Sequence, residues 1–220
     1  MATGVTREVV PGQIWTISKP FARFSGKVGG RATIIKLNSG DLFVVSPTKL
    51  DDGTLEWVNT LGTVKYLMAP DMEHHLFLKP WKEAFPEAQV LAPQGMNLKE
   101  QIKFDYLYTP DHLDQTYGDG EILAHYFPGH KTLEIALLHV PSRTLINADL
   151  THILPAREQY SMTKEDPTKG FVTGLFIKGF SPGNNWLHNF IVTKAQTKDA
   201  KYVLFYVTDE CYETGCQSRE

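Results

Sequence analysis

The sequence predicts an α/β fold, an αββα sandwich in which two packed mixed sheets are flanked by helices. Strand-like segments fill the first third of the chain, and helical and strand-like segments then alternate. A second group of strands follows, and after it comes one more helix and strand. The length of 220 residues, with 42% hydrophobic and 21% charged residues, is typical of one soluble domain with a sizeable core. We therefore expect residues 1–220 to form a single domain.

The first group of helices and strands is predicted from apolar runs that are separated by turn-forming residues. Asp51 or Asp52 can cap a helix that Gly62 ends, and Pro80 disturbs a second, short helix. The helices are expected at residues 51–62 and 74–86. The strands are expected at residues 13–21, 31–40, 41–47, 63–70 and 88–93.

In the second group, one strand is followed by two apolar strands that form a hairpin around the turn at residues 141–143. Residues 151–183 are irregular and rich in Pro, Gly and Lys, so we expect an insertion there that can act as a lid. The strands of this group are expected at residues 121–129, 133–140, 144–150 and 200–212, and one helix is expected at residues 184–196.

Composition excludes several classes of partner. The formal charge is −3 and the basic residues are not clustered, so neither a nucleic acid nor a membrane is an expected partner. No apolar run approaches the ~20 residues that span a bilayer, and the N-terminus does not resemble a secretory signal. Cys211 and Cys216 are too few for a disulfide framework or a zinc knuckle. We expect two free thiols and a cytoplasmic location.

Three segments, in order, resemble the metallo-β-lactamase superfamily. The segment TIIKLNSGDLFVVSP resembles its opening hairpin, and LMAPDMEHHLFL falls where that family carries a His-x-His-x-Asp-His loop. The segment HYFPGHKTLEIALLHVPSRTLINADL resembles the part in which Pro-Gly-His supplies a third histidine and an aspartate after a hairpin bridges the metals. Those roles fall on His130 and Asp149. The resemblance covers residues 10–150, implies the sandwich of this superfamily, and is closest to a divergent branch with an adjacent His-His after an Ala-Pro turn.

The departures from that family are as informative as the matches. Pro70 and Met72 stand where the first two histidines of the loop belong, and neither suits a hard cation. His74 stands at the position of the aspartate, while His75 matches the last histidine. The aspartate that usually ends the opening strand is replaced by Ser46. A complete two-metal site is therefore not expected.

One altered metal position is still compatible with the sequence. A late histidine would complete it, with His188 the first choice and His152 the second. Two adjacent side chains cannot point the same way on a strand or helix, so one of His74 and His75 is expected to bond to the backbone. The candidate metal ligands are His74, His75, His130, Asp149 and His188. The cofactor is then one divalent ion, zinc, iron or manganese, or none.

Three functions fit these residues. The first is a hydrolase of an ester, lactone, thioester or similar small molecule with a mononuclear metal site. The second is a metal-free member of the fold that catalyses dehydration, isomerisation or cyclisation of a hydrophobic small molecule, with His75, His130 and Asp149 as proton-transfer groups. The third is a non-enzymatic binding protein. The expected partner is a small-molecule substrate, and a homo-oligomer is compatible with the sequence.

Overall fold

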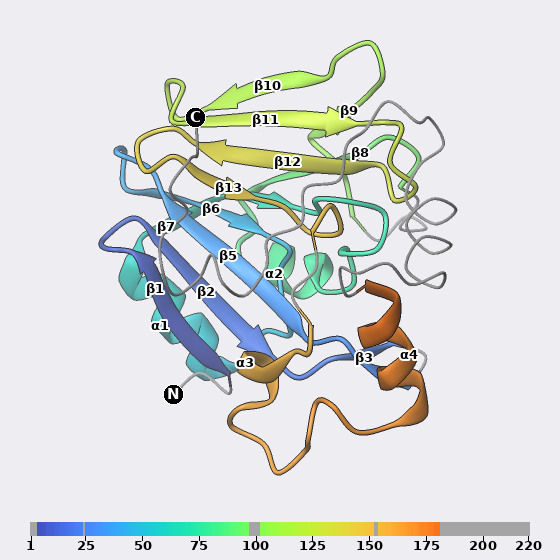
Figure 1. The fold of residues 1–220 in the computed structure, drawn as a ribbon. Helices are drawn as coiled ribbons and strands as arrows, with labels where there is room; N and C mark the ends of the chain where they lie inside the picture. The colour runs from blue at the N-terminus through green and yellow to red at the C-terminus, as the bar shows by residue number, and fades with distance from the viewer. Residues whose placement is uncertain (1–3, 24, 97–101, 152–153, 181–220) are drawn as a thin grey trace, which may run out of the picture.

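The computed structural model describes residues 4–23, 25–96, 102–151 and 154–180, and these form two main β-sheets (Figure 1). The first sheet has the strand order β1-β2-β5-β6-β7-β8-β9, and the second has the order β10-β11-β12-β13. The strands of the first sheet are β1 Val5–Val10, β2 Ile14–Lys19, β5 Gly30–Lys36, β6 Asp41–Val45, β7 Thr63–Met68, β8 Gln89–Pro93 and β9 Tyr106–Tyr108. Those of the second are β10 Asp114–Tyr117, β11 Ile122–Phe127, β12 Glu134–His139 and β13 Thr144–Ile146.

The remaining described elements are a small hairpin and four helices. The hairpin comprises β3 Ala22–Arg23 and β4 Gly26–Lys27. The helices are α1 Asp52–Leu61, α2 Leu78–Ala84, α3 Arg157–Tyr160 and α4 Phe171–Phe180. None of the helices in the described part of the chain has both the length and the apolar character that crossing a membrane requires.

The first sheet is mixed, and its parallel half positions the loops that matter for function. Strands β1, β2, β5 and β6 pair antiparallel, whereas β6, β7, β8 and β9 pair parallel. Helix α1 connects β6 to β7, and α2 connects β7 to β8. The carboxyl ends of these parallel strands therefore meet at one edge of the sheet. The second sheet is antiparallel throughout its described strands.

Side-chain alternation along the strands divides the core into two layers. On β6, Phe43 and Val45 face the second sheet, whereas Leu42 and Val44 face the helices. Isoleucine, leucine and tyrosine side chains of both sheets fill the layer between them. Val58 of α1 and Trp81 of α2 are fully buried in the other layer. The two helices therefore cover the outer face of the seven-stranded sheet.

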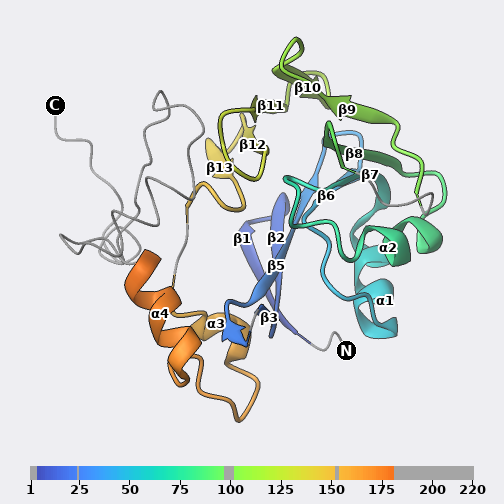
Figure 2. The ribbon, with the colours of Figure 1, turned by 90° about the vertical axis from the view of Figure 1, so that its right-hand side faces the viewer.

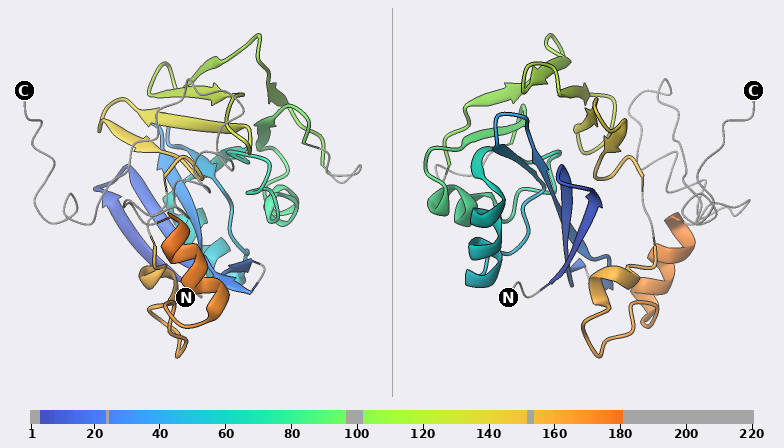
Figure 3. Two further views of the ribbon diagram at one scale, coloured as in Figure 1. Left: turned by 45° about the vertical axis from the view of Figure 1, so that its right-hand side comes forward. Right: turned by 90° about the vertical axis from the view of Figure 1, so that its left-hand side faces the viewer.

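The views in Figures 2 and 3 show α1 and α2 on one side of this sheet and α4 on the other, beside β3. Helix α3 lies against β2 and α4 against β4. The Tyr160 hydroxyl donates to the Phe21 carbonyl at 2.8 Å, and the Lys27 amide donates to the Thr173 hydroxyl at 3.2 Å. The α/β class, with packed sheets flanked by helices, is confirmed. The segment expected as an insertion packs, where it is described, against the start of the first sheet.

A buried lysine on β2 links helix α1 to the first sheet through hydrogen bonds. Lys19, on β2, is only 6% exposed, and its ammonium group donates to the Lys49 carbonyl at 2.7 Å and to the Thr54 hydroxyl at 3.1 Å. It also pairs with Asp51, whose other carboxylate oxygen caps α1 by accepting the Thr54 amide at 2.9 Å. A buried charge is tolerated when it is paired and hydrogen-bonded in this way. Of the two expected caps, Asp51 and Asp52, it is Asp51 that caps the helix.

Some elements differ from the sequence-based expectations. Strands β1, β3, β4, β9 and β10 were not predicted, since β1 is mostly exposed and the others are very short. Residues 151–183 were expected to be irregular but contain helices α3 and α4. The second helix begins at Leu78 rather than at residue 74, which places Pro80 in its first turn, where a proline is tolerated. The helix predicted at residues 184–196 and the strand predicted at residues 200–212 lie outside the described residues.

A buried histidine at the end of β12 makes stability depend on pH. His139 is 1% exposed, and its Nδ1 lies 2.6 Å from the Ser142 hydroxyl. Burial lowers the pKa of His139 below its ordinary value of 6.5, against the opposing charge of Glu121. As the pH falls below about 6.5, the unfolded chain therefore takes up this proton before the folded chain does, and stability is lost.

We expect the His139→Asn variant to lose this part of the pH dependence while retaining an amide that can bond Ser142. The free energy of unfolding, measured by urea denaturation between pH 7.5 and 5, should fall less steeply for the variant than for the parent. Equal slopes for the two proteins would contradict the assignment.

Candidate metal centre

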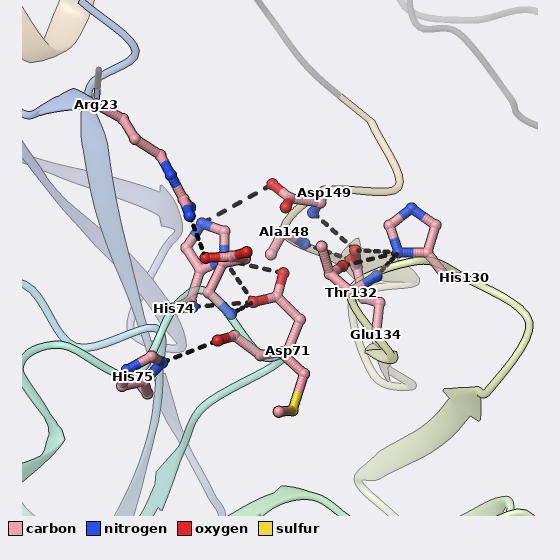
Figure 4. A network of polar contacts seen from close by, with 11 residues as sticks. Arg23, Asp71, His74, His75, His130, Thr132, Glu134, Ala148 and Asp149 are labelled. Atoms are coloured by element: carbon pink, nitrogen blue, oxygen red, sulfur yellow. Dashed lines mark hydrogen bonds and ion pairs between the residues drawn. The ribbon is translucent and has the colours of Figure 1, made fainter. Parts of the chain in front are cut away.

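Three loops meet at the carboxyl edge of the parallel strands. One follows β7, the second precedes β12, and the third follows β13. Two backbone hydrogen bonds join the first two loops: the Met72 amide donates to the Thr132 carbonyl at 2.9 Å, and the Ile135 amide donates to the Pro70 carbonyl at 2.6 Å. These bonds hold the edges of the two sheets together, so polar residues of all three loops gather in one place (Figure 4).

Asp71 organises the loop after β7. Its side chain is fully buried, and one carboxylate oxygen accepts the amides of Glu73 at 2.7 Å and His74 at 2.9 Å. An aspartate that accepts amides two and three residues further on is a common way of closing a tight turn. The same carboxylate accepts a hydrogen bond from His74 Nδ1, which lies 2.8 and 2.9 Å from its two oxygens. This fixes the orientation of the imidazole.

With Nδ1 bonded to Asp71, the other nitrogen of His74 faces the third loop. His74 Nε2 lies 4.0 Å from the Asp149 carboxylate. Asp71, His74 and Asp149 each offer one ligand atom, and these three atoms all lie within 4.8 Å of one another. Among the residues that the structure describes, this is the group whose side chains can hold a metal ion together.

The charges of this group perturb one another strongly. Burial would lower the pKa of His74, but the hydrogen bond and charge of Asp71, with further contributions from Asp149 and Glu134, raise it to about 9. Burial and the charge of Asp71 raise the pKa of Asp149 to about 6. Burial would also raise the pKa of Asp71, but the bond from His74 holds it below its ordinary value. At neutral pH two carboxylates thus surround one imidazolium, and the group as a whole keeps a net negative charge.

The structure places His75 outside this group. His75 Nδ1 donates to the Met72 carbonyl at 3.0 Å, so its ring turns away from Asp149. The expectation that one of the two adjacent histidines bonds to the backbone is therefore confirmed, and His74 is the one that faces the site. His188 and His152 lie outside the described residues.

His130 lies on the far side of Glu134 from His74 (Figure 4). It is 4% exposed, and its Nδ1 lies 2.8 Å from the Thr132 hydroxyl. Its Nε2 is buried and has no hydrogen-bond partner in the described part of the chain. Burial lowers the pKa of His130, so the neutral imidazole is favoured.

Sequence reasoning missed Asp71 and did not assign Glu134. Alignment to the six-residue family motif puts Asp71 at a spacer position, although a carboxylate just after a buried strand and three residues before a histidine is itself a signal. Glu134 begins β12, is fully buried, and accepts the amides of Ala148 at 2.6 Å and Asp149 at 2.7 Å. Burial raises the pKa of Glu134 to about 8, although the Ala148 bond opposes this shift.

An ion pair borders the site on the side of the β3–β4 hairpin. Arg23 and Glu73 pair there, and both side chains are partly exposed. The positive charge of Arg23 acts against the increase in the pKa of Asp149, so it reaches the group electrostatically. The acidic group therefore has one cationic neighbour at its rim.

The donor chemistry of Asp71, His74 and Asp149 is compatible with a divalent cation. Carboxylate oxygen and imidazole nitrogen suit zinc, iron and manganese. Three protein ligands leave a position open, which is typical of catalytic rather than structural sites.

Comparison with known proteins agrees with this architecture. A family model described as a domain of unknown function (DUF4336) matches residues 11–98, and no curated protein matches the chain. Solved structures similar to it include the DIM-1 metallo-β-lactamase exposed to ceftazidime, with 16% identity, a TM-score of 0.57 and coverage of 70% of this chain and 73% of that one. TMB-1 has 11% identity, a TM-score of 0.56 and coverage of 70% and 73%. A metallo-β-lactamase from Pontibacter korlensis has 12% identity, a TM-score of 0.53 and coverage of 70% and 75%.

Fold and comparisons together define a protein with the metallo-β-lactamase fold. Identities this low show the fold alone, and function has to be argued from the site. The assignment to a branch with an adjacent His-His stays a prediction.

Proposed function

We propose that this protein is a small-molecule hydrolase, acting on an ester, lactone or thioester, with one divalent cation held by Asp71, His74 and Asp149. The observation that supports it most directly is the convergence of their three ligand atoms within 4.8 Å. A bound cation of this kind supplies Lewis acidity, which polarises a carbonyl group and makes water a stronger nucleophile at neutral pH. Zinc, iron and manganese are the proposed ions.

Each residue near the site would have a separate role. In the cation-free protein Asp71 holds the imidazole of His74 through Nδ1. As a ligand beside His74 it would exchange this hydrogen bond for the cation, and the imidazole would lose one proton. Asp149 supplies the opposing carboxylate. His130 has a buried, unpartnered Nε2 and would offer a neutral hydrogen-bonding group to substrate. His75 has no part in this proposal because its ring is bonded to the backbone.

The first test is metal content together with hydrolysis. Tag-free protein should contain close to one equivalent of zinc, iron or manganese by mass spectrometry. Hydrolysis of at least one member of a panel of aryl esters, lactones and thioesters should disappear on chelation and return when the same cation is restored. Protein that binds none of these cations, even after supplementation, would overturn the proposal.

One observation favours a second function. His74 faces a carboxylate on each side, so its charge is balanced without any cation. In that case His74 and Asp149, with pKa values of about 9 and about 6, would exchange protons with a bound substrate. Dehydration, isomerisation or cyclisation of a hydrophobic small molecule that continues in the presence of a chelator would support this alternative.

A further inference from the structure

Glu134 has an unusual place for a carboxylate. It is the first residue of β12, is fully buried, and contacts the loop that carries Asp149. Its two oxygens are used separately: one accepts the Ala148 amide at 2.6 Å, and the other accepts the Asp149 amide at 2.7 Å. A carboxylate is the one side-chain group that offers two adjacent acceptors to a pair of backbone donors.

The sheet itself does not hold this part of the loop. In the register of β12 with β13, the last pair is Leu137 with Ile146, so the chain leaves the ladder before Ala148. Beyond that point the amides of Ala148 and Asp149 have the Glu134 side chain as their partner. Asn147 and Thr151 close the loop on itself through two side-chain hydrogen bonds, at 2.9 and 3.1 Å. Glu134 is thus what ties this closed loop to the sheet.

The backbone next to Glu134 is itself constrained. Leu133 has φ of 58°, in the left-handed region that bulky residues rarely adopt. Its amide donates to the His130 carbonyl at 3.0 Å, and the next amide after Glu134, that of Ile135, donates to Pro70 in the loop of Asp71. Backbone in such a sparsely populated region persists only where its surroundings determine it, and it is frequent at functional sites. Glu134 is therefore anchored to the same loop that positions His74.

We propose that Glu134 is a positioning residue that sets cation affinity by holding Asp149 opposite His74. This inference rests on the proposed function, because it concerns how the Asp71–His74–Asp149 group is kept in place. A glutamine at this position has the same shape but turns one acceptor into a donor, which then opposes a backbone N–H group. The loop must move to relieve that contact, and Asp149 moves with it.

Glu121 offers a matched control. Its carboxylate is also bonded to backbone, with both oxygens accepting the Asn38 amide at 3.1 and 3.0 Å, and it lies outside the metal group. If replacement of any backbone-bonded glutamate disturbed the fold enough to affect cation binding, Glu121→Gln would do so too. Glu134→Asp serves as the conservative variant, since it retains the carboxylate on a shorter side chain.

The experiment measures Co²⁺ affinity by isothermal titration calorimetry, at mildly alkaline pH so that Glu134 is ionised, with the visible absorption of bound Co²⁺ as a second signal. Glu134→Gln is expected to weaken Co²⁺ binding by about 10- to 100-fold, the usual effect of losing a partner of a metal ligand. Glu134→Asp should recover part of that loss, and Glu121→Gln should bind as the parent does. A folded Glu134→Gln variant with the affinity and spectrum of the parent would overturn the inference.

Hydrogen exchange of the Ala148 and Asp149 amides in metal-free protein separates this inference from the proposed function. Both amides should be protected in the parent and exchange faster in Glu134→Gln. If the parent binds no cation, the hydrolase proposal and the effect on affinity both fail, while faster exchange would still show that Glu134 holds the loop. If the parent binds Co²⁺ and exchange is unchanged in the variant, the positioning role fails and the metal site stands.

Discussion

The His74→Ala variant is expected to lose divalent cation binding, with the dissociation constant rising by more than about 100-fold, because even the loss of an outer partner of a metal ligand costs 10- to 100-fold. His74 is the only nitrogen donor of the described group, and its Nε2 is the atom that faces Asp149. Competition with a chromophoric chelator, using Zn²⁺, measures the constant directly.

The adjacent histidine provides the control. His75 has the same chemistry one residue away, but its Nδ1 is bonded to the Met72 carbonyl. We expect His75→Ala to bind Zn²⁺ within a few-fold of the parent. The opposite pattern, with His75→Ala losing the ion and His74→Ala retaining it, would show that the loop after β7 presents the other imidazole.

The Trp81→Ala variant is expected to lose about 3–5 kcal/mol of unfolding free energy, the usual range for an aromatic residue removed from a core. Trp81 is fully buried beneath the first sheet and packs against Phe85 with ring centroids 5.8 Å apart. Its indole N–H donates to the Thr48 carbonyl at 2.8 Å, and the substitution leaves that acceptor buried without its partner. Urea denaturation followed by circular dichroism measures the loss.

Trp57 is the comparison for this prediction. It packs against the same apolar cluster from α1 but is only partly buried. Trp57→Ala should therefore cost clearly less than Trp81→Ala. A loss for Trp81→Ala of under about 1 kcal/mol, which is ordinary for any substitution, would mean that this layer repacks around the gap.

Sequence reasoning predicts the fold better than the site because the two depend on different information. Apolar runs such as those at residues 63–70 and 133–140 are set by burial in the sheets, and β7 and β12 lie within them. Periodicity gives no such signal for β1, whose residues are mostly exposed. Its place at the edge of the sheet depends on pairing with β2.

At the site, position along the chain is a poor guide to proximity. The resemblance identifies Asp149, and His74 is among the candidates that it supplies. It passes over Asp71, because that residue has no counterpart in the family motif, and its role arises from a local turn. Glu134 and His139 are five residues apart on one strand, which places their side chains on opposite faces of the sheet. Which of them meets Asp149 depends on where the loop after β13 passes, and no local pattern encodes that.

The two backbone bonds that join the loops of Pro70–Met72 and Thr132–Ile135 also bear on how the protein folds. All of β8 to β11 lies between the two loops in the chain, so closing this contact costs more conformational entropy than closing any hairpin among the described strands. Contacts between distant segments generally form slowly. We therefore expect the cation-binding group to be completed only when the two sheets have docked. A chain with native secondary structure but undocked sheets would then bind no ion, so that ion binding distinguishes the finished protein from its folding intermediates.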